Sequence, residues 1–142
     1  MRLMMMVRAT KETEAGVRPS PEIVNAMMKY NEELVKAGVL LDAGGLQPSS
    51  NGVRVTWPDG KPKATDGPFT ETKELIAGFW IIEVKSKEEA LEWAMRVPNP
   101  TGDKDAAIEL RPFAQAPDLT DDAEAMRKEA ELRTQVEKQR KP

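Results

Sequence analysis

The segment from Ile76 to Val84 constrains the fold of this chain more than any other part of the sequence. Residues 79–82 read Phe-Trp-Ile-Ile without a polar break, a pattern typical of a strand that is covered on both faces. The opening segment, Met1–Val7, is also largely apolar on both faces of a predicted strand. The chain therefore needs a sheet with two covered faces.

Two helices are predicted around these strands. The first begins after Ser20, which suits an N-cap, with Pro21 at the first helical position, and it ends at Gly38. The second begins after Ser86, and Glu89 completes a capping box. The predicted apolar stripe of the first helix comprises Ile23, Val24, Met27, Met28, Leu34 and Val35. The predicted apolar side of the second comprises Ala90, Leu91, Ala94 and Met95.

The remaining segments read as short strands, loops and a polar tail. They are a loop at Thr10–Ser20, a strand at Val39–Leu41, a bulge or turn at Gly44-Gly45, a hairpin over Val53–Thr65, a strand at Ala107–Leu110 and a charged helix from about Thr120 to Lys138. The tail has a thin apolar set and is expected to lie outside the core.

The order of elements predicts an α+β fold. Two helix crossovers place the flanking strands in one antiparallel, ferredoxin-like sheet with both helices on one face and the hairpin as an insertion. The second face of the sheet then needs another cover. A second copy of the chain is favoured as that cover, and the alternative is that the C-terminal helix folds back over its own sheet.

Composition excludes several kinds of chemistry. The chain has no cysteine and no histidine, so thiol nucleophiles, disulfides and triads that use histidine are absent. The net charge of -3, without a dense basic stripe, argues against direct binding of nucleic acid. The sequence shows neither a membrane span nor a signal peptide, and a cytoplasmic protein is expected.

One block of the sequence resembles a known family. Asp66-Gly67-Pro68-Phe69, followed by Thr70–Glu74 and then by Gly78–Val84, resembles the DGPF subgroup of the YCII-related proteins. The segments Ala37–Leu46, Ser86–Met95 and Ile108–Phe113 agree with it. The resemblance covers residues 1–114 as one domain and leaves residues 115–142 as a charged helical extension.

The resemblance implies a dimeric α/β barrel in which two ferredoxin-like protomers pack their sheets together. It does not imply a settled reaction. The catalysis proposed for YCII-like proteins relies on a histidine and aspartate pair, and the position of that histidine falls near Met27 in this chain. Some DGPF relatives are encoded beside sigma-factor-like regulators, or fused to them, which hints at a regulatory setting.

Two carboxylates are the candidate catalytic groups. Asp42 interrupts an apolar strand, so it either faces solvent at an edge or is a partly buried acid or base. Asp66 heads a turn, where its side chain either accepts backbone hydrogen bonds or contacts a ligand together with Glu71 and Lys73.

The leading hypothesis is a small-molecule cleft between the first helix and the sheet. Met27, Tyr30 and Phe69 would help to wall it, and Lys73 or Arg111 would stabilise a developing anion. No metal or cofactor is expected, because neither a phosphate-binding loop nor a calcium loop is present. The alternative hypothesis is a non-enzymatic dimeric module, linked to sigma-factor-type control, whose charged tail makes the contact.

Overall fold

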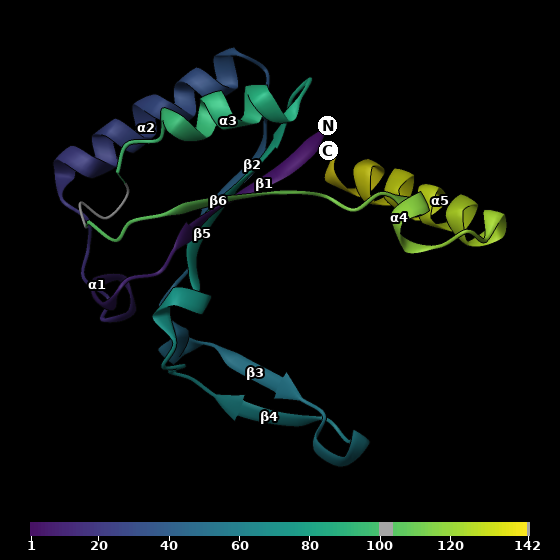
Figure 1. Cartoon of the computed structure of the whole chain (residues 1–142), viewed down its shortest axis with the longest axis horizontal. Coiled ribbons are helices and arrows are strands. Elements are labelled where there is room, and N and C mark those ends of the chain that lie inside the picture. The colour runs from purple at the N-terminus through teal and green to yellow at the C-terminus, as the bar shows by residue number, and fades with distance from the viewer. Residues whose placement is uncertain (100–103, 142) are drawn as a thin grey trace. The chain divides into compact units, whose positions relative to one another are not determined.

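The computed structural model describes residues 1–99 and 104–141, and the chain divides into two compact units, Met1–Pro112 and Phe113–Pro142. In the described part of the first unit, four strands form an antiparallel sheet in the order β2-β5-β1-β6 (Figure 1). These strands are β1 (Arg2–Arg8), β2 (Leu40–Gly45), β5 (Ile76–Glu83) and β6 (Ile108–Pro112). The order is that of a ferredoxin-like sheet, so the predicted α+β fold is confirmed.

Two helices, α2 (Pro21–Lys36) and α3 (Lys87–Met95), lie together on one side of this sheet (Figure 1). The Oγ atom of Ser20 accepts a hydrogen bond from the amide of Ile23, and Oγ of Ser86 accepts one from the amide of Glu89. Both predicted N-caps are therefore present. The core between helices and sheet consists of buried apolar side chains: Leu3, Met5, Val7, Tyr30, Leu34, Val39, Trp80, Ile82, Val84, Ala90 and Trp93.

An aromatic cluster joins α2, α3 and the sheet. The ring of Tyr30 lies edge-on to Trp80, at 5.7 Å between centroids, and to Trp93, at 6.2 Å. Beside this cluster, Arg96 forms an ion pair with Glu33 at 2.6 Å and stacks over the ring of Trp93. These contacts fix the two helices against each other.

The predicted apolar side of α3 is confirmed for Ala90 and Ala94, which pack in the core, and wrong for Leu91 and Met95, because the buried face is rotated about the helix axis. Ala90 and Trp93 are the buried residues of α3, whereas Leu91 is 53% exposed and Met95 is 79% exposed. The helix turns Trp93 inward because the large indole ring packs against Tyr30. Burial of that ring outweighs the smaller gain from Leu91.

Two local predictions are also corrected. The segment predicted as a loop contains a short helix, α1 (Lys11–Glu14), whose N-cap Thr10 exchanges hydrogen bonds with Thr13. The segment Gly44-Gly45 is neither a bulge nor a turn, because both glycines pair in register with β5 as the last residues of β2. The register shift of this strand pair lies between Leu40 and Asp42. Pairing across the sheet keeps this glycine-rich segment extended.

The inserted hairpin is present as β3 (Val53–Thr56) and β4 (Lys63–Asp66), which form a sheet of their own. Both strands are exposed along their full length. The hairpin therefore adds nothing to the core.

The face of the main sheet opposite α2 and α3, called the open face below, is covered by neither of these two helices (Figure 1). Pairing register places Met4, Met6, Phe79 and Ile81 on this face, and all four are half-buried. The sheet ends at strands β2 and β6 and does not close into a barrel within one chain, and the expected dimeric barrel stays a prediction.

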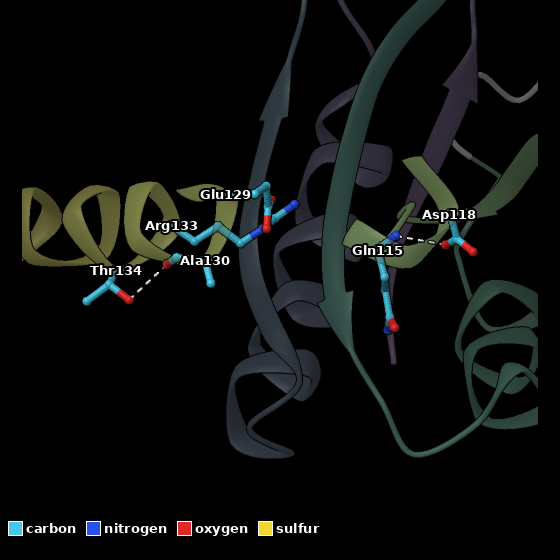
Figure 2. Close-up of polar contacts among 6 residues, drawn as sticks. All are labelled: Gln115, Asp118, Glu129, Ala130, Arg133 and Thr134. Atoms are coloured by element: carbon cyan, nitrogen blue, oxygen red, sulfur yellow. Dashed lines mark hydrogen bonds and ion pairs between the residues drawn. The ribbon is translucent and has the colours of Figure 1, made fainter. Parts of the chain in front are cut away.

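The second unit contains α4 (Ala116–Leu119) and α5 (Ala123–Arg140), and none of the described residues of these helices is buried. Contacts within the helix stabilise α5. They include an ion pair between Arg133 and Glu129 and a hydrogen bond from Thr134 to the carbonyl of Ala130 at 3.1 Å (Figure 2). No described helix combines the length and apolar character needed to cross a bilayer.

Candidate functional site

A cavity of about 750 Å³ lies between α2, the segment that leads from α1 into α2, and strands β2 and β5. Its described lining comprises Val7, Thr10, Glu12, Thr13, Gly16, Val17, Arg18, Pro19, Ser20, Ile23, Met27, Asn31, Ala43, Gly44, Gly45, Leu46, Pro48, Ala77, Gly78, Phe79 and Trp80. Most of these residues are apolar or small, so the cavity suits an apolar molecule.

Small residues on the sheet create this hollow. Gly45 pairs with Gly78 in the register of β2 and β5, and Ala43 is the partner of Trp80. Towards the other end of the sheet, Trp80 and Ile82 fill the space under α2. At the glycine end no side chain rises from either strand, so the space beneath α2 stays open.

The two glycines differ in what a larger residue would meet. A Cβ atom at Gly78 would lie 3.0 Å from the carbonyl oxygen of Gly44, which is a tight contact with backbone. A Cβ atom at Gly45 would meet nothing within 4 Å. Gly45 can therefore accept a side chain, whereas Gly78 is required for close approach of the strands.

Asn31 provides an amide group in the apolar lining. Its side-chain oxygen accepts a hydrogen bond from Nε1 of Trp80 at 2.8 Å, and Trp80 is only 4% exposed. The indole nitrogen is a donor only, so it fixes which end of the amide faces it. Within residues 1–99 and 104–141, no group accepts a hydrogen bond from Nδ2 of Asn31.

Charge is confined to exposed residues of the lining. Among the described lining residues, Glu12 and Arg18 carry charge, and both are exposed. Their charges are opposite, so the lining has no net charge. The hydroxyl groups of Thr10 and Thr13 hydrogen-bond to each other's backbone at the start of α1.

Met27 is the predicted ligand-binding residue that the structure places in the cavity lining. Tyr30, one turn further along α2, is instead buried in the core, and its hydroxyl donates a hydrogen bond to the carbonyl of Trp93 at 2.8 Å. Burial raises the pKa of Tyr30 to about 12, with smaller opposing effects from Arg96, which lowers it, and Glu33, which raises it. The hydroxyl of Tyr30 is therefore directed to Trp93 rather than into the cavity.

The register places Asp42 and Arg111 on the open face of the sheet, away from the helix side. Asp42 pairs with Ile81, and Ile81 pairs in turn with Met4. Arg111 pairs with Met4 from the other side. Asp42 and Arg111 therefore lie in the same row of side chains across the sheet. Both Asp42 and Arg111 are exposed, and the carboxylate of Asp42 accepts a hydrogen bond from the amide of Ala43 at 2.9 Å. Of the two positions considered for Asp42, the structure shows the exposed one.

The Asp66-Gly67-Pro68-Phe69 turn lies at the base of the hairpin, outside the cavity lining. Asp66, Glu71 and Lys73 are all exposed. Within the described ranges no group donates a hydrogen bond to the carboxylate of Asp66, so the expected contact with following amides is absent. Phe69 lies under the guanidinium of Arg54, which is 3.9 Å from the centre of the ring.

The turn packs against the short helical turn at Ser49–Asn51. Oγ of Ser49 accepts a hydrogen bond from the amide of Phe69 at 2.9 Å and donates one to the carboxylate of Glu14. A Cβ atom at Gly67 would overlap the carbonyl oxygen of Ser49. This network explains a glycine at position 67 as a requirement for packing.

The structure therefore does not bring the predicted site residues together in one cleft. Their catalytic and binding roles stay predictions, except that Met27 has the expected position. Within the described residues, no group of three or more acidic side chains is arranged to hold a metal ion.

Two features of the cavity were not predicted from the sequence: Asn31, and the paired glycines Gly45 and Gly78 beneath α2. Asn31 follows Ile23 and Met27 at intervals of four residues, so it interrupts the apolar stripe of α2, and a polar residue on a buried stripe is an available signal. No comparable signal in the sequence indicates the glycine pair, because Gly45 and Gly78 meet only through the pairing of β2 with β5.

These features define a small ferredoxin-like α+β protein with a cavity between its first long helix and its sheet. The chain belongs to the family described as the YCII-related domain, which residues 1–114 match. It is 30% identical, over 92 residues, to an uncharacterised protein of Rhizobium meliloti (strain 1021), covering 65% of this chain and 73% of that protein. The DGPF subgroup stays a prediction.

A solved structure is also similar to this chain. It is 5-chloro-2-hydroxyhydroquinone dehydrochlorinase (TftG) from Burkholderia phenoliruptrix AC1100, in complex with 2,5-dihydroxybenzoquinone. The TM-score is 0.45 at 13% sequence identity, with 82% of this chain and 97% of that chain covered.

Proposed function

We propose that this protein binds a small, mainly apolar molecule in the cavity beneath α2. The observation that carries the proposal is the hollow itself, which arises where Gly45 and Gly78 pair and which Met27 and Trp80 help to line. Its volume of about 750 Å³ lies within the range of about 300–1,000 Å³ that is usual for ligand pockets.

The proposal assigns no reaction to the cavity. Asp42 and Asp66, the predicted acid or base groups, are not among the residues that line it. The alternative of a non-enzymatic regulatory module stays a prediction.

The test uses isopropenylnaphthalene, a flat fluorescent hydrocarbon, as the probe. A Gly45→Val variant adds a side chain where a Cβ atom meets nothing within 4 Å, so the fold is expected to persist while part of the hollow fills. We expect wild-type protein to bind the probe and Gly45→Val to bind it at least about tenfold more weakly, since lost burial of a few apolar groups is worth roughly 1–2 kcal/mol.

Ala64→Val is the matched control, because it enlarges an exposed strand residue of the hairpin outside the lining. It should bind the probe as wild type does. Absence of binding to wild-type protein, or equal binding by Gly45→Val and wild type, would overturn the proposal.

We also propose that two copies of the chain pair through the open face of the sheet. Met4, Met6, Phe79 and Ile81 lie together on this face. Neighbouring apolar side chains on a face that α2 and α3 leave uncovered favour an interface over an exposed surface. A symmetric pair would bury this face of both copies.

A further inference from the structure

We propose that the cavity selects a neutral apolar molecule carrying one hydrogen-bond acceptor, such as a ketone or ester carbonyl, and that Nδ2 of Asn31 donates to that oxygen. This inference rests on the proposed function, because it names the class of molecule that the same cavity binds. Asn31 lies on α2, four residues after Met27, which also lines the cavity.

The amide of Asn31 has a fixed orientation. Nε1 of Trp80 donates to its oxygen at 2.8 Å, and a reversed amide would place two donors against each other. The indole is itself held, because Trp80 is buried and its ring packs against Tyr30. The group left for a ligand is therefore the NH₂ end, which only donates.

Nδ2 of Asn31 is reachable rather than sealed. Among the described residues, no buried side-chain nitrogen or oxygen lacks a hydrogen-bond partner. Nδ2 has no partner in the described residues, so it must be accessible, and Asn31 lines the cavity. A ligand that offered no acceptor would cover this donor and leave it unpaired, which is unfavourable.

The charges of the lining favour a neutral ligand. The described lining offers one carboxylate, Glu12, and one guanidinium, Arg18, and both are exposed. An ion that entered the apolar part of the cavity would lose its hydration without gaining a buried partner of opposite charge. A carbonyl oxygen needs only one donor, which Asn31 supplies.

The experiment compares two flat molecules of nearly equal shape, isopropenylnaphthalene and acetylnaphthalene, substituted at the same ring position. They differ only in a methylene group against a carbonyl oxygen. We expect wild-type protein to bind the acetyl compound about threefold to tenfold more tightly, in line with one hydrogen bond of about 1 kcal/mol. Naphthoate, with a carboxylate at the same position, should bind at least about tenfold more weakly than the acetyl compound.

An Asn31→Asp variant tests the assigned atom. One carboxylate oxygen can still accept from Trp80, while the other presents an acceptor where wild type has a donor. The preference for the acetyl compound should disappear or reverse. Asn25→Asp is the matched control, because Asn25 is exposed on the same helix and outside the lining, and it should keep the wild-type preference.

The outcomes separate this inference from the proposed function. If neither neutral naphthalene binds wild-type protein, the cavity proposal itself fails. If both bind equally, or if Asn31→Asp binds with the wild-type preference, the cavity proposal stands and the role of Asn31 is overturned. If naphthoate binds as tightly as the acetyl compound, the selection of neutral molecules is overturned. Should Asn31→Asp fail to fold, the comparison of the three naphthalenes on wild-type protein still decides the ligand class.

Discussion

Tyr30 shows how one residue can link the helices, the sheet and the response to pH. It is the single tyrosine of the chain, and the sequence predicts it as a residue that helps to wall the ligand cleft. In the structure it is 3% exposed, and its hydroxyl satisfies the carbonyl of Trp93. The side chain is therefore part of the core rather than of the ligand site.

The stability of the fold should fall at high pH through Tyr30. Burial raises its pKa from 10.0 to about 12, so the folded state holds the phenolic proton more tightly than the unfolded state. The contribution of Tyr30 to the free energy of unfolding is fully present below the pKa of tyrosine in the unfolded chain. It is lost as pH rises through the pKa of Tyr30 in the folded state, and it amounts to about 3 kcal/mol at most. Urea unfolding at a series of pH values measures it, and tyrosinate absorbance reports this one side chain.

Tyr30→Phe is the control for that titration. It removes the hydrogen bond to Trp93 and should lower the free energy of unfolding by roughly 1 kcal/mol at neutral pH. It should also remove the part of the high-pH loss that is due to Tyr30. An identical pH profile in wild type and Tyr30→Phe would contradict the assignment.

Gly67 is a second residue whose identity the packing explains. Gly67→Ala should destabilise the protein by about 2 kcal/mol or more, because the added Cβ atom would overlap the carbonyl oxygen of Ser49. Gly45→Ala, where a Cβ atom meets nothing within 4 Å, is the control and should have little effect. Thermal unfolding compares the two variants, and equal melting temperatures would contradict this packing role.

At the scale of elements, α3 shows that a helix can be predicted correctly in place and wrongly in rotation. Its N-cap Ser86 is where the sequence indicates. The face it buries depends on the aromatic cluster, which the sequence of α3 alone does not contain. Trp93 packs against Tyr30 of α2, so the rotation of α3 is decided by a neighbouring helix.

The rotation of α3 predicts unequal effects of two truncations. Trp93→Ala should lower the free energy of unfolding by about 3 kcal/mol or more, as is usual for a buried large aromatic side chain. Leu91→Ala, at a residue that is 53% exposed, should change it by less than about 1 kcal/mol. Denaturant unfolding of both variants measures the difference. A larger loss from Leu91→Ala would mean that the other face of α3 is buried.

At the scale of the whole molecule, the open sheet face is the main unpartnered feature of the first unit. Ile81 lies on it between Asp42 of β2 and Met4 of β1. Proteins seldom leave such a set of apolar side chains without a cover. The proposed pairing of two sheets would supply that cover.

A charge on the open face should separate the two copies. In Ile81→Glu the new carboxylate lies beside Asp42 in the register, and both copies would bring this charge into an apolar interface. We expect the wild type to be dimeric by light scattering and the dimer of Ile81→Glu to dissociate at least about tenfold more readily. Leu91→Glu, on the exposed side of α3, should remain dimeric. A monomeric wild type, or an unaltered dimer in Ile81→Glu, would contradict the pairing.

The sequence by itself determined most of the strands, the starts of α2 and α3, and the ferredoxin-like plan of the sheet. These depend on local signals, namely the apolar run of β5 and the N-caps Ser20 and Ser86, and on the crossover rules that place the flanking strands in one sheet. Such signals act within a few residues or follow from chain connectivity, so they can be read without a structure.

Only the tertiary structure decided which side chains share a cavity. Whether Gly45 meets Gly78, and whether Asn31 meets Trp80, depends on strand register and helix rotation. A shift of one residue in a strand moves a side chain to the opposite face, which is why Asp42 lies on the open face and not under α2. The ligand site is therefore a property of long-range packing, and the sequence alone marked only Met27 within it.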